Sequence, residues 1–128
     1  MGRYYSGDIE GKFWVGVQSS SDADFFGQTG EASFLHYYFD KSDLENIEAG
    51  VRECERMLGD NRIKLDAFFE VNHGYNDNKL GAYLGIEVKP DRFGDPEIAR
   101  LMEWYARLEL GEEILACVKA TGSCRFDA

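Results

Sequence analysis

The 128-residue sequence has few of the residues that mark specialised protein classes, with two prolines, three cysteines and two histidines. No apolar run approaches the roughly 18 residues that a membrane helix needs. The first eight residues, Met1 to Asp8, lack the apolar segment of a signal peptide. We therefore expect a cytoplasmic protein with no membrane partner.

The cysteines, Cys54, Cys117 and Cys124, are odd in number and lack the spacing of paired zinc ligands. This pattern favours free thiols that behave as small hydrophobic side chains. We expect no disulfide framework, no structural metal and no cofactor. Cys117 and Cys124 could form a redox-active pair only if a helix ended between them.

Basic residues are also scarce, since 14 Lys and Arg face 24 Asp and Glu and give a net charge of −10. Binding to a phosphate backbone depends on clustered cations, so direct nucleic-acid binding is not expected. The acidic residues are spread evenly and interleave with basic ones, which favours a role in solubility. A surface that imitates nucleic acid and occupies a basic protein groove is the alternative.

Aromatic residues are abundant, and ten of the eighteen lie before residue 41. Residues 12–18 alternate in the manner of a strand, with Phe, Val and Val on one face, and residues 33–39 predict a second strand. A hairpin of two strands is marginal alone. A third strand could come from residues 4–9, 86–88 or 124–126, and the sequence does not decide among them.

From Ser42 onward, apolar spacings of three and four residues predict helices. Ser42 and Glu45 form a capping-box pattern, and Asp95 followed by Pro96 is a strong helix start. The predicted helices cover residues 42–59, 60–74, 76–85 and 95–122. A glycine at position 111 is expected to bend or divide the last of them.

Together these patterns predict an α+β fold, with a small antiparallel sheet in the N-terminal third covered by three to five helices. The length suits one domain over residues 1–128, made of an aromatic-rich β part (1–41) and a mainly helical part (42–128).

No catalytic motif is present, so we do not expect an enzyme. His36 and His73 have no partner at a recognisable spacing, and both are interpreted as structural. Two pairs of carboxylates stand two residues apart: Asp22 with Asp24, and Asp8 with Glu10. The first pair could help to bind a hard cation, but turn formation or helix capping explains it as well, and the second is typical of a solvated strand edge.

The most site-like pattern surrounds Gly16, which interrupts the predicted strand 12–18 between Trp14 and Gln18. A glycine inside a strand indicates a bulge or a group that approaches the backbone closely. The structural alternative is that Trp14 covers the core while Gly16 fits beneath a helix.

Residues 2–14 (GRYYSGDIEGKFW) and 16–20 (GVQSS), with GYN at 74–76 and LELG at 108–111, resemble small uncharacterised proteins encoded by bacteriophages and large viruses. The resemblance brings no activity and no site residues. It implies a viral accessory protein of the host-cell cytoplasm that antagonises a host defence by binding and blocking a host component.

Three functions follow as hypotheses. The first is capture of a small planar or nucleotide-like ligand by stacking and by contacts with its anionic group. Its candidate residues are Arg3, Tyr4, Tyr5, Lys12, Trp14 and Gln18. The second is a protein-binding inhibitor, or nucleic-acid mimic, that uses an aromatic anchor and acidic steering to occupy a basic host surface. The third is an enzyme without a recognisable motif. The sequence predicts no oligomeric state.

Overall fold

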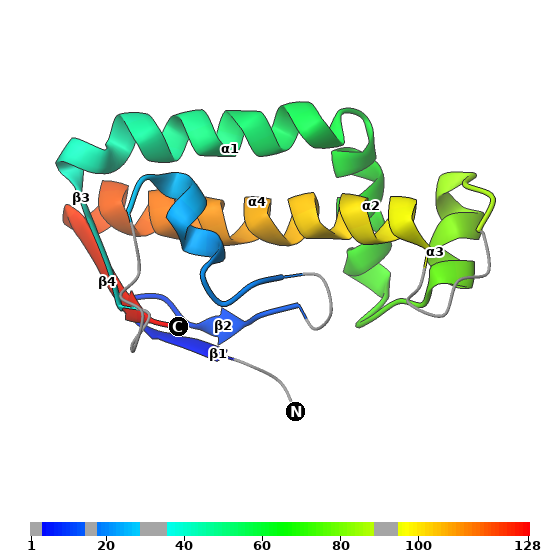
Figure 1. Ribbon diagram of the computed structural model, residues 1–128, viewed down its shortest axis with the longest axis horizontal. Helices are drawn as coiled ribbons and strands as arrows, with labels where there is room; N and C mark the ends of the chain where they lie inside the picture. Colours follow the sequence, from blue (N-terminus) through cyan, green and yellow to red (C-terminus); the bar gives the residue numbers. More distant parts are fainter. Residues whose placement is uncertain (1–3, 15–17, 29–35, 89–94) are drawn as a thin grey trace.

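The computed structural model describes residues 4–14, 18–28, 36–88 and 95–128. Within these residues, the fold consists of four α-helices and a four-stranded antiparallel sheet (Figure 1). Helices α1 (Leu44–Leu58) and α4 (Pro96–Thr121) run side by side, with the sheet at one end. Helices α2 (Asn61–Val71) and α3 (Asp77–Leu84) lie at the other end. The α+β prediction is therefore confirmed.

The sheet joins the two ends of the chain. Its strands are β1 (Tyr4–Gly7), β2 (Gly11–Lys12), β3 (His36–Asp40) and β4 (Ser123–Asp127), in the order β2-β1-β4-β3. The C-terminal strand β4 thus lies between two strands from the N-terminal third, with Phe126 opposite both Tyr37 and Gly7. Two of the three candidate third strands therefore enter the same sheet, and residues 86–88 form no strand.

The strand predicted over residues 12–18 is wrong beyond its first residue. β2 ends at Lys12, and Phe13, Trp14 and Gln18 lie outside the strands. The Gln18 backbone N–H donates to the Trp14 carbonyl at 3.0 Å, which an extended strand would not allow. Gly16 lies outside the described residues. The strand predicted over 33–39 is confirmed from His36 and extends to Asp40, while 33–35 also lie outside them.

The helix starts follow the capping signals with one shift. The Asp95 side chain accepts from the N–H groups of Glu97 and Ile98, and the Asn76 side chain accepts from Lys79. The capping box, however, is formed by Asp40 and Asp43 around the short 3₁₀ helix η2 (Lys41–Asp43), and not by Ser42 and Glu45. The capping box lies at Asp40 and Asp43 because the helical segment begins with a 3₁₀ turn that directly precedes α1.

The core fills the space between the sheet, α1 and α4. The rings of Tyr37, Phe39 and Phe126 stack on the inner face of the sheet, with centroids 5.2–6.3 Å apart. The apolar residues at helical spacing on α1 and α4 are not all buried to the same degree. Ile47, Val51, Tyr105 and Leu108 are buried, whereas Leu44, Leu101 and Leu115 are only partly buried against the core.

Helix α4 continues through Gly111, so the glycine does not divide it. A Cβ at this position would lie 2.5 Å from two ring atoms of Phe26, and one at Gly50 on α1 would lie 2.7 Å from the same ring. Phe26, which ends the 3₁₀ helix η1 (Asp22–Phe26), is fully buried. The two glycines therefore let η1 insert an aromatic ring between the long helices.

Gly111→Ala is expected to destabilise the protein by up to about 2 kcal/mol, because overpacking against Phe26 costs roughly 1–3 kcal/mol and outweighs the gain of about 1 kcal/mol in helix propensity. Denaturant unfolding measures the change, with Gly74→Ala as control since a Cβ there meets nothing within 4 Å. The double variant Gly111→Ala/Phe26→Leu should regain part of the loss. A stabilised Gly111→Ala variant would contradict this account of the packing.

The cysteines differ in exposure. Cys54 and Cys124 are fully buried, and burial raises the pKa of the Cys54 thiol to about 12 and that of Cys124 further still. Helix α4 ends between Cys117 and Cys124, and the half-buried Cys117 thiol donates to the Ser123 carbonyl at 3.3 Å. Cys117 also contacts the Cys124 thiol.

Alkylation at pH 8 should therefore select Cys117. Cys54 is expected to react at least about tenfold more slowly, because its thiol is buried and carries little thiolate. Peptide mass spectrometry after timed iodoacetamide treatment measures both rates, and the same treatment in denaturant should make the three cysteines similar. Equal native rates would show that the helix packing around Cys54 is open.

Candidate functional site

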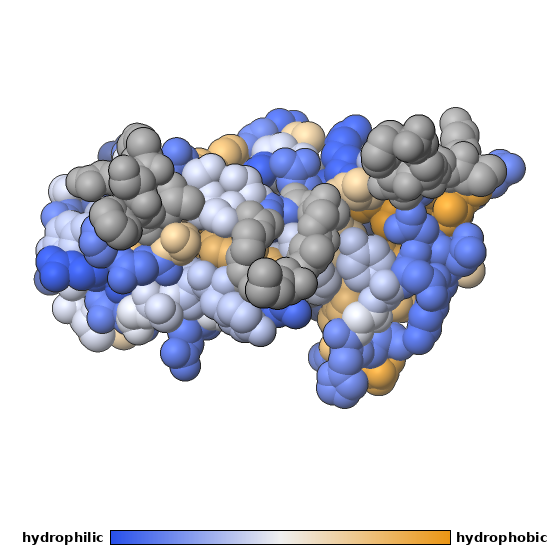
Figure 2. Space-filling view, turned by 60° about the horizontal axis from the view of Figure 1, so that its bottom comes forward, coloured by the Kyte–Doolittle hydropathy of each residue, from blue (hydrophilic) through white to orange (hydrophobic). Residues whose placement is uncertain are grey.

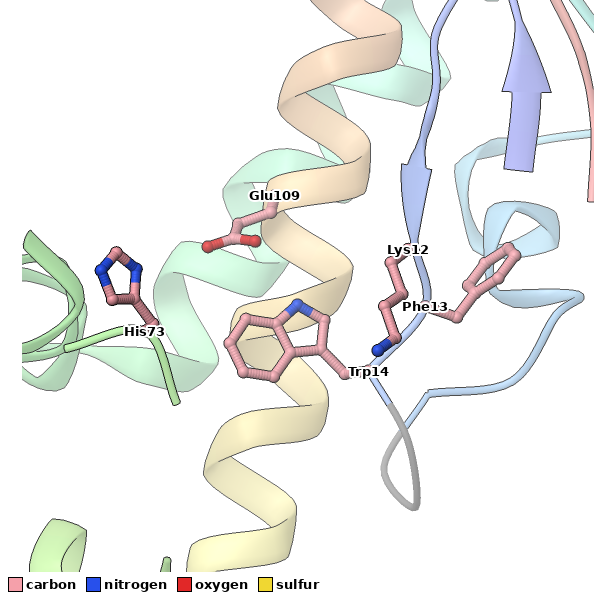
Figure 3. Close-up of a pocket in the computed structure, with 5 residues that line it drawn as sticks. All are labelled: Lys12, Phe13, Trp14, His73 and Glu109. Carbon is pink, nitrogen blue, oxygen red and sulfur yellow. The ribbon is translucent and has the colours of Figure 1, made fainter. Parts of the chain in front are cut away.

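A pocket of about 390 Å³ opens between the chain that follows β2, helix α4 and the segment after α2. It is lined by Lys12, Phe13, Trp14, His73 and Glu109 (Figure 3). Its volume lies within the range of small-molecule sites, about 300–1,000 Å³. The pocket combines an aromatic ring, a lysine, a histidine and a carboxyl group.

The lining side chains come from three parts of the fold. In Figure 3 the Trp14 indole lies between Lys12 and Glu109, and His73 lies beyond Glu109. Phe13 points away from Trp14 and is buried against the Tyr5 ring at 5.0 Å. The pocket therefore has a cationic side at Lys12 and an acidic side at Glu109, with an aromatic ring between them.

Two neighbouring rings hold Trp14 in place. The Phe69 ring meets it edge to face at 5.3 Å, and the Tyr75 ring lies tilted at 6.2 Å. The indole N–H donates to the Glu109 carboxylate. Trp14 is consequently half-buried and oriented, which lowers the entropy that a stacking ligand would lose by ordering it.

Glu109 is the partly buried acid of the pocket. Burial raises the pKa of its carboxyl, and the charges of Glu113 and Asp66 raise it further. The Tyr105 hydroxyl contacts both Glu109 and Asp66, and it donates its proton to Asp66 Oδ1 at 2.7 Å. Burial and like-charged neighbours thus disfavour the ionised form of Glu109, while the bonds from the Trp14 indole and the Tyr105 hydroxyl offset part of this cost.

A second carboxyl contact ties the sheet to α4 beside the pocket. The Tyr5 hydroxyl donates to Glu113 Oε2 at 2.7 Å, and burial together with this bond raises the pKa of Tyr5. A Cβ on Gly11 would lie 2.4 Å from the Tyr5 hydroxyl oxygen. Gly11 is therefore needed so that the tyrosine can cross β2 and reach the helix.

The structure separates the six residues predicted as a site. Lys12 and Trp14 line the pocket, while Tyr4 is 66% exposed on β1 opposite Lys12. Tyr5 is buried and bonded to Glu113. Arg3 lies outside the described residues.

The sixth, Gln18, is buried and engages several groups with its amide. Its Oε1 accepts from the Trp14 backbone N–H at 3.0 Å, and its Nε2 donates to Asp22 Oδ2 at 3.0 Å and to the Ala106 carbonyl at 3.3 Å. These bonds connect Trp14 to η1 and α4. Gln18 therefore positions the Trp14 backbone and is not among the residues that line the pocket.

Asp22 continues this network to a buried cation. Arg107 Nε donates to Asp22 Oδ1 at 2.6 Å, and the guanidinium lies 4.5 Å from the Trp104 ring and 5.1 Å from the Phe25 ring. The side chains of Arg107 and Asp22 are only 14% and 4% exposed. Asp24 instead accepts from the Tyr37 hydroxyl at 2.6 Å. Both carboxylates thus bond to distant parts of the fold, and no described side chain caps η1, so the expected capping role is not the one that the structure shows.

Glu109 was not predicted as a site residue from the sequence, and His73 was interpreted only as a structural residue at a helix end. Tyr105, Glu109 and Glu113 follow one another at intervals of four residues, so one face of α4 carries a tyrosine and two acids. This spacing was a usable signal. That the face meets Trp14, however, depends on the packing of segments far apart in the sequence.

Comparison with protein-family models, curated proteins and solved structures yields no significant match. Among the described residues, no group of three or more His, Cys, Asp or Glu side chains could hold a metal ion. None of the described helices is both long and apolar enough to cross a membrane.

Glu109→Gln is expected to raise the thermal unfolding midpoint at pH 7–8, because the amide can still accept from Trp14 without burying a charge. The Glu109 pKa is higher in the folded than in the unfolded chain, so ionisation costs stability above the folded pKa. This cost disappears as the pH falls below the unfolded value of about 4.3.

Melting curves from pH 4 to 8 check the prediction. The difference between variant and parent should be largest at the alkaline end and shrink steadily toward pH 4. The same pattern, caused by burial, is expected at Glu113, where the bond from Tyr5 limits the effect. A variant that is less stable than the parent at pH 8 would show that the carboxylate charge contributes to the fold.

Proposed function

We propose that the protein binds a small planar ligand that carries an anionic group, such as a nucleotide, in the pocket between Lys12 and Glu109. The observation that supports this most directly is the placement of an oriented indole between a lysine and a carboxyl group in one pocket of about 390 Å³. Ligand rings stack on such a surface, and stacking of a base on an aromatic side chain contributes about 1–3 kcal/mol.

Lys12 supplies the contact for the anionic group. Its side chain is exposed at the end of β2, next to Trp14. The net charge of −10 opposes long-range attraction of an anion, but a charge-assisted hydrogen bond acts at short range. A small ligand with one phosphate is therefore a better fit than a polymer with many.

We propose binding without catalysis. None of the five lining residues is a serine, threonine or cysteine, and the Glu109 carboxylate is bonded to the ring that would stack on the ligand. The further proposal, that the protein is a viral accessory factor which removes such a ligand from a host defence pathway, depends on the sequence resemblance alone.

A protein-binding inhibitor is the second candidate, favoured by the far end of the molecule. Ile63, Val71 and Tyr83 on α2 and α3 are 75%, 80% and 47% exposed, and Figure 2 shows apolar side chains at this end. Exposed apolar and aromatic residues often anchor a protein interface. Acidic residues around them would attract a basic partner. Association that weakens with salt and with Ile63→Asp, but not with Lys12→Ala, would favour this function.

Ligand capture can be tested by the fluorescence of Trp14. In a Trp104→Phe background, Trp14 is the remaining tryptophan, and a stacked nucleotide should quench its emission. Lys12→Ala should weaken nucleotide binding by about tenfold or more, since a charge-assisted bond contributes about 1.5–3 kcal/mol.

Lys119→Ala is the matched control. Lys119 is an exposed lysine paired with Glu48, ten residues along α4 from Glu109 and so about 15 Å away. It should leave binding unchanged. If no purine or pyrimidine nucleotide quenches Trp14 at millimolar concentration, or if both lysine variants weaken binding equally, ligand capture in this pocket is wrong.

A further inference from the structure

The acidic side of the pocket restricts which edge a bound ligand can present to it. Glu109 lies on α4 beside the Trp14 ring, which places a carboxyl group at the edge of any molecule stacked on that ring. An anionic ligand would be repelled if its charge faced this group. The ligand must therefore turn its anionic group toward Lys12 and a different edge toward Glu109.

Glu109 also has accepting capacity beyond its internal bonds. A carboxylate offers about four acceptor positions. The Trp14 indole donates to it, and the Tyr105 hydroxyl contacts it as well as Asp66, so these two neighbours fill at most two of the acceptor positions. The charges that act on it, from Glu113 and Asp66, have its own sign. A ligand that brings hydrogen-bond donors would supply what these neighbours do not.

On the basis of the proposed function, we propose that Glu109 selects the ligand by its edge and that the pocket recognises a guanine-type nucleotide. Guanine presents two adjacent donors, N1–H and the 2-amino group, and a carboxylate can accept both at once. The base would stack on Trp14 while its phosphate meets Lys12. One molecule then satisfies the aromatic, acidic and cationic features of the pocket together.

Other planar ligands fit this edge less well. Hypoxanthine keeps N1–H but lacks the amino group, so it offers one donor. Adenine presents its amino group beside the N1 acceptor, whose lone pair would face the carboxylate. A simple organic cation would pair with Glu109, but it carries no anionic group for the neighbouring Lys12 to bind. The combination of charges therefore favours the guanine edge.

Titration calorimetry with GMP, IMP and AMP on the full chain tests the inference. The parent should bind GMP about tenfold or more tightly than IMP, because loss of one hydrogen bond to a charged group has that effect, and AMP more weakly still. Lys12→Ala should weaken all three nucleotides by a similar factor, since it acts on the phosphate that they share.

Glu109→Gln is the decisive variant because its amide offers one acceptor and one donor. This pattern no longer matches two donors but does match the adenine edge, so the preference should move from GMP toward AMP. Glu113→Gln is the matched control. It removes the acid one helical turn away that accepts from Tyr5, outside the pocket lining, and should keep the GMP preference.

The outcomes separate the two proposals. A GMP preference that is lost in Glu109→Gln and kept in Glu113→Gln supports edge selection. Equal binding of the three nucleotides, still weakened by Lys12→Ala, would overturn edge selection and leave ligand capture in place. Absence of binding by all three to the folded parent would overturn both.

Discussion

The buried ion pair between Asp22 and Arg107 is the contact on which the site depends. It attaches η1 to the middle of α4, and Gln18 bonds both to this carboxylate and to the backbone of Trp14. Desolvation makes such a pair costly, yet removal of one partner leaves an uncompensated charge and typically costs about 3–5 kcal/mol. The Phe25 and Trp104 rings that flank the guanidinium exclude water from the pair and add cation–π attraction. The pair therefore restricts where Trp14 can lie.

Helix α4 carries the opposing half of the same arrangement. Arg107 holds the N-terminal segment on one side, Gly111 admits the Phe26 ring, and Glu109 and Glu113 receive donors from Trp14 and Tyr5. These residues lie within two turns of one continuous helix, so their relative positions are rigid. The pocket is consequently built by docking a short irregular segment on a regular element, a design that places functional groups more accurately than a loop alone.

The sequence predicted what local chemistry decides. Asp95 with Pro96 and the stop at Gly122 set the bounds of α4, and the aromatic segment before residue 41 supplied three of the four strands. The strand over 12–18 failed because alternation cannot reveal that Gln18 bonds back to Trp14, a contact supported by Asp22 and α4. Within the site, Lys12 and Trp14 could be predicted because they adjoin each other in the chain. The place of Glu109 in the site could not be predicted, because it depends on contact with Trp14, which lies 95 positions away in the sequence.

Glu109 shows how the fold tolerates a group that weakens it. A purely structural position would favour a neutral amide, which keeps the bond from Trp14 and avoids repulsion from Glu113 and Asp66. The Trp14 indole N–H and the Tyr105 hydroxyl, which also donates to Asp66, replace only part of the hydration that the carboxylate loses by burial. Departures from the most stable choice are expected where a residue serves a ligand. The same reasoning separates Glu109 from Asp22, whose carboxylate is more deeply buried but has a counter-charge in Arg107.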